Sequence, residues 1–448
     1  MPDRLPALPR RLPAQAPQAA ASLAGLLALS DWLFLGHPAG LSLAVFAGAA
    51  FAASLALRPA DAPPPVGPLA LMALGVLPVV EHVQPLSVLF LLGATVTAVA
   101  WAQGAPRDAT RLLGAMAFAA PRDALRALAM APASAERAPV SRLAATWALP
   151  VGGALVLTAF ILQANPLAAR WLAVEPDVDL WIGRAVLWTG IALMCWPLLT
   201  GVPPRAARAV RARGLPGVSP ASISRALVVF NAILAVQSAT DAAILWGGAS
   251  LPDGLSWAEY AHRGAYPLLA TALLAIPFSL AARPHLGSSR LLHALLFLWL
   301  AQNLMLTASA GLRLAAYVEA FGFTHLRLHA AVWMATVAAG LILALWQVVA
   351  ERSTGWLVRR EAALGLGVLW ACCFVNFAAL VAAGNLARGR EIDWYHLCAL
   401  PRTAHAAIAA AGNPAHCRLR APTTRGWRDW DFRDQRVRSM LAAMEAGR

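Results

Sequence analysis

Residues 85–102 read PLSVLFLLGATVTAVAWA, an apolar run without a charged side chain. At a rise of ~1.5 Å per residue, a helix of this length crosses most of a hydrocarbon core of roughly 30 Å. Similar apolar runs recur along the chain. We therefore predict about eleven membrane-spanning helices, at residues 19–36, 39–57, 66–80, 85–102, 146–164, 181–200, 226–246, 264–282, 291–310, 328–349 and 363–383.

The composition of the whole chain supports a membrane location. Of its 448 residues, 59% are hydrophobic and 13% are charged, and the mean hydropathy is +0.61. This is too little charge for the surface of an ordinary soluble enzyme. The predicted fold class is all-α, a polytopic transmembrane helical bundle, and the lipid bilayer is its predicted partner.

The basic residues indicate an orientation in the membrane. All 36 of them are Arg, and the formal net charge is +14. Nucleic-acid binding requires a contiguous basic face with interleaved aromatic residues, whereas these Arg residues lie mainly in loops between apolar runs, so we exclude nucleic acid as a partner. The Arg-rich loops 103–142, 201–225 and 350–362 fall on one side of the predicted bundle, which the positive-inside rule assigns to the cytoplasm.

An odd number of spans places the two ends of the chain on opposite sides, so the N-terminus is predicted inside and the C-terminus outside. The predicted organisation is a cytoplasmic basic leader (1–18), a transmembrane bundle (19–383) and an extracytoplasmic tail (384–448). The tail contains Cys398 and Cys417, and an oxidising exterior favours a disulfide between them. Two unpaired thiols are the alternative, because sequence spacing does not fix the distance between the Cα atoms.

Motifs of common hydrolases, ATPases and c-type cytochromes are absent from the sequence, and no cofactor is predicted. Polar residues instead gather near the external ends of the later spans. Asp241 shares a helical stripe with Asn231 and Ser238. A lone carboxylate in a span costs on the order of 2.5–3.5 kcal/mol, so Asp241 is expected to find a partner, as is Asp31 in the first span.

The loop after Asp241 brings Glu259, Tyr260, His262 and Arg263 close together in sequence. An interfacial anchor is the simpler interpretation, because Tyr and Trp favour the headgroup level. Further along, Gln302 and Asn303 lie within a span, and residues 311–324 are predicted to form a short interfacial or re-entrant helix. His325 and His329 have a spacing that suits a metal, but interfacial hydrogen bonding is the preferred interpretation and no metal site is predicted.

Several of these segments carry a family resemblance. The runs Tyr260–Leu268, Arg313–Tyr317 and Gly322–Arg327, with Asp393–Leu397 and Trp427–Phe432 in the tail, resemble bacterial membrane proteins of the domain of unknown function 4173 family, to which the 4153 group is related. The resemblance extends from about Ser224 to the C-terminus. It implies a multi-pass protein of the bacterial inner (cytoplasmic) membrane with no established reaction.

Three functions remain open from the sequence. The favoured hypothesis is an outward-facing polar pocket for an anionic or lipid-linked envelope ligand, with or without catalysis, because Arg matches phosphate oxygens in two-point contacts. The alternatives are a proton- or cation-coupled small-solute transporter and a non-catalytic sensor or assembly component. The residues predicted to build the pocket are Asp241, Glu259, Tyr260, His262, Arg263, Gln302, Asn303, Arg313, Tyr317, Glu319, His325 and Arg327.

Overall fold

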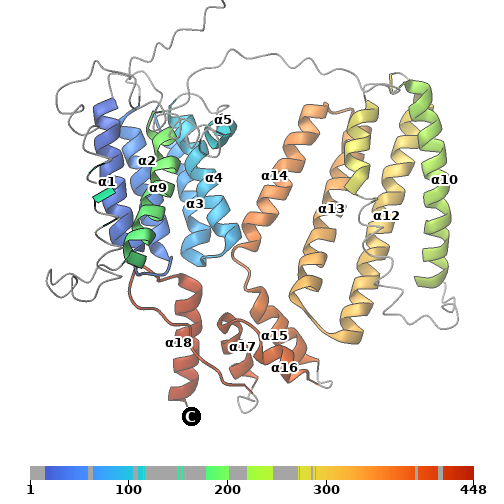
Figure 1. The fold of residues 1–448 in the computed structure, drawn as a ribbon. Helices are drawn as coiled ribbons and strands as arrows, with labels where there is room; N and C mark the ends of the chain where they lie inside the picture. The colour runs from blue at the N-terminus through green and yellow to red at the C-terminus, as the bar shows by residue number, and fades with distance from the viewer. Residues whose placement is uncertain are drawn as a thin grey trace, which may run out of the picture. The chain divides into compact units, whose positions relative to one another are not determined.

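A computed structural model describes most of the chain, and Figure 1 shows it as a ribbon. The described residues are 16–58, 64–103, 109–114, 116, 150, 153–154, 157, 178–200, 219–245, 271, 273–283, 286–287, 289–388, 392–411 and 417–447. Within these ranges the regular structure is helical and contains no strand. The chain divides into two compact units, residues 1–206 with 424–432 and residues 207–423 with 433–448.

The first unit is a group of packed apolar helices. Helices α3 (Val66–Glu81) and α4 (Pro85–Ala102) form a hairpin, and α1 (Ala16–Phe34) packs against α2 (Leu41–Ala56) and α9 (Val178–Thr200). The short α5 (Ala109–Gly114) follows α4. Leu33, Val79 and Val99 are among the fully buried side chains of its two hydrophobic clusters.

The second unit is built around two long helices, α12 (Arg290–Phe321) and α13 (His325–Val349). Helix α12 packs against α10 (Pro220–Leu245), and α13 packs against α14 (Thr354–Cys372). Side chains fix where these helices begin, because Ser289, Thr324 and Ser353 each accept a hydrogen bond from a backbone N–H in the first turn of α12, α13 and α14.

Smaller helices of the second unit form a separate core after α14. They are α15 (Phe377–Ala387), α16 (Trp394–Cys398), η4 (Arg402–Ala404) and α17 (His405–Ala410). Val381, Leu397 and Ile408 are fully buried in this core. The last helix, α18 (Phe432–Ala446), shares a smaller apolar cluster with Ala406 of α17 through Val437 and Leu441. A disulfide joins Cys398 to Cys417, whose Cα atoms are 5.2 Å apart.

Five described helices are long and apolar enough to cross a membrane. They are Pro85–Ala102, Asp179–Thr200, Pro220–Ala243, Arg290–Phe321 and His325–Val349. A sixth span results if α14 and α15 count as one broken segment. Three further apolar helices are shorter, namely Leu41–Ala56, Val66–Glu81 and Leu273–Ala282. The expected span at 146–164 lies largely outside the described residues. The count of eleven and the orientation of the termini remain predictions.

Two expected segments take a different form in the structure. The span predicted at 363–383 is broken, because α14 ends at Cys372 and α15 departs from it at 70°. Residues 311–321 are not a separate interfacial or re-entrant helix but the last turns of α12, which ends at Phe321 and is capped by Gly322. Gly322 has φ = 79°, a conformation that side chains other than glycine rarely adopt.

Candidate functional site

The structure describes eight of the twelve residues of the predicted pocket. Glu259, Tyr260, His262 and Arg263 lie outside the described residues. Of the remaining members, Asp241, Gln302, Asn303 and Arg313 belong to α10 and to the middle of α12. Tyr317, Glu319, His325 and Arg327 surround the turn between α12 and α13.

Asp241 and Arg313 form an ion pair between α10 and α12. The Asp241 side chain is 0% exposed and the Arg313 side chain is 4% exposed. Gln237, one turn before Asp241, donates from Nε2 to Asp241 Oδ1 at 2.7 Å. Each charge therefore has a partner, as burial in an apolar bundle demands, because an uncompensated buried charge is costly.

More polar groups lie along the interface between α10 and α12. Asn231 donates from Nδ2 to the Leu295 carbonyl at 3.0 Å. This second link between the two helices lies nearer their N-terminal ends than the ion pair does. The residue that comes later in α10 contacts the residue that comes later in α12, so α10 and α12 run parallel. Several buried oxygens here have no hydrogen-bond partner among the described residues, namely Asn231 Oδ1, Ser238 Oγ, Gln302 Oε1 and Asn303 Oδ1.

Arg327 closes the C-terminal end of α12. Its Nη1 group donates to the carbonyls of Phe321 at 2.9 Å and Gly322 at 2.5 Å. Its guanidinium carbon lies 4.2 Å from the centroid of the Tyr317 ring, a cation–π distance. A cation at this end also complements the partial negative charge of the last carbonyls of the helix.

Asn385 of α15 and Arg388, the residue directly after α15, hold the same turn, and the sequence did not single them out. Arg388 donates to the carbonyls of Val318 and Glu319. Asn385 accepts from the Phe323 N–H at 2.6 Å and donates to the Phe323 carbonyl at 2.9 Å. In the sequence they are recognisable only as two polar residues, three positions apart, that follow an apolar run. Their partners lie more than sixty residues earlier, so no sequence pattern pairs them.

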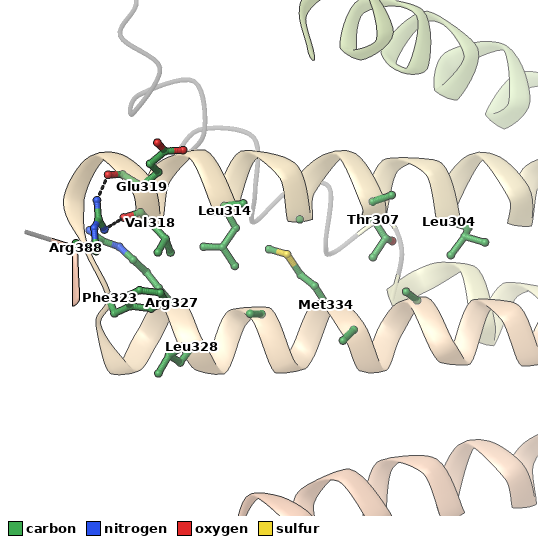
Figure 2. Close-up of a pocket in the computed structure, with 16 residues that line it drawn as sticks. Leu304, Thr307, Leu314, Val318, Glu319, Phe323, Arg327, Leu328, Met334 and Arg388 are labelled. Carbon is green, nitrogen blue, oxygen red and sulfur yellow. Dashed lines mark hydrogen bonds between the residues drawn. The ribbon is translucent and has the colours of Figure 1, made fainter. Parts of the chain in front are cut away.

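The turn forms one end of a groove of about 690 Å³ between α12 and α13, shown in Figure 2. Small side chains line much of its length on both helices. On α12 they include Ala308, Gly311 and Ala315, and on α13 Ala331, Ala335 and Ala338. Glu319, Arg327 and Arg388 gather at the turn end of the groove. The groove therefore combines an apolar body with a charged end that carries two guanidinium groups and one carboxylate.

His325 and His329 lie about one turn apart at the start of α13. Their ring centroids are 6.4 Å apart, and the His329 ring packs edge-on against Phe377 at 4.6 Å. The interfacial interpretation of the two imidazoles remains a prediction.

A family match covers most of this architecture. Residues 66–411 match the family described as Domain of unknown function (DUF4153). The chain belongs to the DUF4153 family. The match begins at α3, whereas the resemblance in the sequence motifs begins only near Ser224. The matching family is DUF4153 and not the 4173 family. No curated protein and no solved structure matches the chain.

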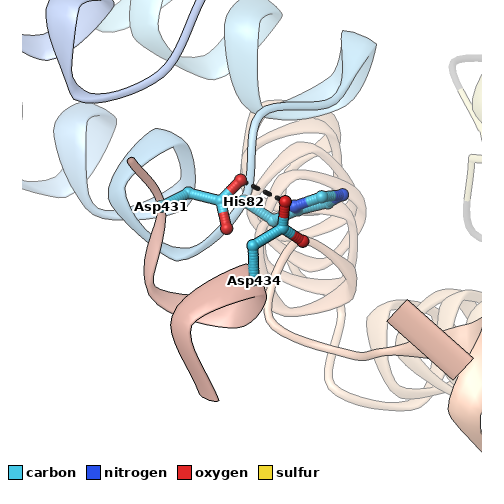
Figure 3. A group of neighbouring side chains, drawn as sticks. All are labelled: His82, Asp431 and Asp434. Carbon is cyan, nitrogen blue, oxygen red and sulfur yellow. Dashed lines mark hydrogen bonds and ion pairs between the residues drawn. The ribbon is translucent and has the colours of Figure 1, made fainter. Parts of the chain in front are cut away.

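The DUF4153 match includes the buried ion pair and every residue that lines the groove. It ends before the segment 424–432, which packs on the first unit. There the backbone N–H groups of Leu41 and Ser42 donate to Trp430 O at 2.9 Å and Arg428 O at 3.1 Å. Figure 3 shows Asp431 beside His82, with 3.0 Å between Oδ2 and Nδ1. This segment supplies the acceptors that the first turn of α2 lacks.

Proposed function

We propose that this membrane protein binds an anionic lipid in the groove between α12 and α13. The acyl or isoprenoid chain lies along the apolar body, and the headgroup lies at Arg327 and Arg388. The observation that carries the proposal is the form of the groove, an elongated apolar cavity of about 690 Å³ with guanidinium groups at one end.

The lining residues favour a ligand chain over an empty space. Small residues on facing helices ordinarily let the backbones approach closely. Here the same residues border an open groove, since a Cβ added at Gly311 would meet no atom within 4 Å. An unfilled apolar cavity costs free energy in proportion to its volume. A lipid chain removes that cost and leaves the helices in place.

The charged end suits a phosphate headgroup. The carbonyl contacts of Arg327 among the described residues use its Nη1 group, so Nε and Nη2 remain to donate to a ligand. Guanidinium groups match phosphate oxygens in bidentate geometry. Together with Arg388, the groove end carries a net positive charge against the single carboxylate of Glu319.

The proposed site faces the exterior. Asn385 and Arg388 tie the groove end to α15, whose hydrophobic core also contains the disulfide cysteines. Disulfides persist in oxidising compartments and not in the cytosol. The ligand is therefore a lipid of the outer leaflet or a lipid-linked intermediate of the envelope.

Native mass spectrometry of the purified protein tests this proposal, with phosphatidylglycerol and phosphatidylcholine of the same chain length added in parallel. Gly311→Leu fills the groove and is expected to lower phosphatidylglycerol binding at least about tenfold, which is a loss of ~1.4 kcal/mol. Gly367→Leu on α14 is the matched control, because a Cβ at Gly367 also meets nothing within 4 Å and Gly367 does not line the groove.

The control variant is expected to bind phosphatidylglycerol as the unchanged protein does, and phosphatidylcholine is expected to bind more weakly. Undiminished binding to the Gly311→Leu variant would overturn the proposed location. Equal binding of the two lipids would overturn the role of Arg327 and Arg388.

A further inference from the structure

Glu361 is an acidic residue inside an apolar helix. The sequence pattern assigns it to the Arg-rich loop 350–362, but in the structure it lies in the second turn of α14. Its carboxylate lies against Gly340 of α13, where an added Cβ would be 2.7 Å from Oε2 and 3.3 Å from Oε1. The absence of a side chain at Gly340 therefore makes the space that this carboxyl group occupies.

The contact lies deep in a candidate span. Gly340 is nine residues before Val349, the last residue of α13, which corresponds to about 14 Å along the helix axis. Helix α13 is one of the five described helices that are long and apolar enough to cross a membrane. The Glu361 carboxyl group therefore lies against α13 about 14 Å from the C-terminal end of that helix.

Glu361 is partly buried, and one of its two carboxyl oxygens is enclosed. Oε1 is buried and has no hydrogen-bond partner among the described residues. The Cδ1 atom of Ile276, from the apolar helix Leu273–Ala282, lies 3.2 Å from the Cβ position at Gly340.

Charged groups on the packed helices lie elsewhere. On α13 the titratable residues are His325, Arg327 and His329, in its first two turns, more than ten residues from Gly340. Helix Leu273–Ala282 carries none and is followed by Arg283. On α14, Arg359 and Arg360 precede Glu361, and residues adjacent in sequence point to different faces of a helix. The Arg360 guanidinium lies 5.9 Å from the Trp356 ring.

A second buried polar group lies between Glu361 and the nearer end of the helix pair. Gln347 is 1% exposed, and its Nε2 has no hydrogen-bond partner among the described residues. It lies seven residues after Gly340 on α13, about 10 Å closer to the connection between α13 and α14. Buried polar groups without a protein partner are groups that ordered water commonly satisfies.

We propose that Glu361 is an intramembrane proton-binding site, reached by water past Gln347 from the α13–α14 connection. A carboxylate without a counter-ion is unstable in hydrocarbon, whereas the protonated carboxyl group is tolerated. The bound ligand of this site is therefore a proton. The proposal rests on the α13–α14 interface and is independent of the lipid groove.

Labelling with N,N′-dicyclohexylcarbodiimide, an apolar reagent that partitions into bilayers, tests the proposal. The protonated carboxyl group adds across one C=N bond of the reagent to give an O-acylisourea, which rearranges to a stable N-acylurea. Nothing leaves, so Glu361 gains the whole mass of the reagent. Peptide mass spectrometry of the full chain in liposomes is expected to find the adduct at Glu361, with a yield at least about fivefold higher at pH 6 than at pH 8.

Substitutions at three positions test whether the labelling depends on this site and not on a general reactivity of carboxyl groups with the reagent. Gly340→Ala places a methyl group where the carboxyl group lies and is expected to reduce the adduct, whereas Gly365→Ala, where a Cβ meets nothing within 4 Å, leaves it unchanged. Glu361→Gln copies the protonated form and is expected to keep the thermal stability at pH 7. Absence of the adduct from folded protein, or loss of stability in Glu361→Gln, would overturn the proposal, because either result means an ionised and paired carboxylate.

Discussion

Each unit of the protein contains an Asp–Arg pair that joins two helices, and the two pairs differ in their access to the surroundings. In the first unit, Arg184 of α9 meets Asp31 of α1 in two contacts of 3.1 Å, and the side chains are 27% and 23% exposed. In the second unit, Asp241 and Arg313 are almost completely buried. The same chemistry therefore occurs at an accessible site and at a closed one.

The difference decides what each pair can do. A buried pair must keep both partners, because removal of one leaves a charge in an apolar interior. An accessible pair can lose a partner and regain contact with water or headgroups. We interpret Asp241–Arg313 as a structural link between α10 and α12, and we assign ligand binding to the groove.

The largest effect is expected from Arg313→Met, which keeps the volume and removes the charge. Asp241 then remains buried without its counter-ion, and the free energy of unfolding is expected to fall by roughly 3–5 kcal/mol. Thermal unfolding of the purified protein in detergent measures this change. The double variant Asp241→Asn with Arg313→Met is expected to recover most of the loss. A single variant as stable as the unchanged protein would show that Asp241 reaches solvent.

The disulfide of the second unit is expected to have the next largest effect. Cys398→Ser opens a loop whose ends are 19 residues apart, and a cross-link over such a loop contributes about 3 kcal/mol. Helices α15 to α17 are expected to open first, because Cys417 belongs to their core. Limited proteolysis of the tail reports this opening, and Cys195→Ser, outside that core, is the control. Equal cleavage of the two variants would contradict the assigned role.

A smaller effect is expected from Asp31→Asn. The partly exposed pair contributes about 0.2–1 kcal/mol, and screening by salt weakens it. Thermal unfolding at low and high ionic strength measures both features. The exchanged variant Asp31→Arg with Arg184→Asp is expected to restore the contact. If Asp31→Asn lowered the free energy of unfolding as much as Arg313→Met does, the two ion pairs would not differ in their contribution to stability.

The smallest effect is expected from acid, at the segment 424–432. Partial burial alone would raise the pKa of Asp429, but the Arg425 and Gly426 N–H groups that donate to its carboxylate hold the pKa below its ordinary value. The stabilisation is present above the ordinary pKa of an aspartate, about 3.9, and is lost as the pH falls through the lower, folded-state pKa.

Hydrogen exchange measures this effect at the Leu41 and Ser42 amides, whose acceptors lie in the segment. After correction for the intrinsic rate, exchange is expected to increase below the ordinary pKa, and Asp429→Asn is expected to remove that dependence. Constant protection down to pH 2 would show that Asp429 does not hold the segment.

Local patterns in the sequence predict much of the helical structure. The apolar run 85–102 coincides with α4, and the run 66–80 differs from α3 by one residue. The demand for a partner at Asp241 also follows from the sequence, because a lone intramembrane carboxylate is costly. These features depend on neighbouring residues alone.

Contacts between segments that are distant in the sequence cannot be predicted from such local patterns. Arg388 and Asn385 bind carbonyls and a turn that precede them by more than sixty residues. The predicted span ends at residue 310, but α12 continues for eleven more residues to Phe321, and Arg313 in this extension turns inward to Asp241. Glu361 falls in the predicted loop 350–362, and only the packing of α14 on α13 places its carboxyl group against Gly340.

The most direct test of the account is a photo-crosslinking map with a phosphatidylglycerol that carries a diazirine in its acyl chain. After illumination in liposomes, we expect the adducts to concentrate on Ala315, Ala331 and Met334, which line the groove, and to be lost in Gly311→Leu. Adducts spread evenly over the exposed faces of α12 and α13, with Leu312 and Trp333 labelled as strongly as the groove residues, would contradict a lipid site between these helices.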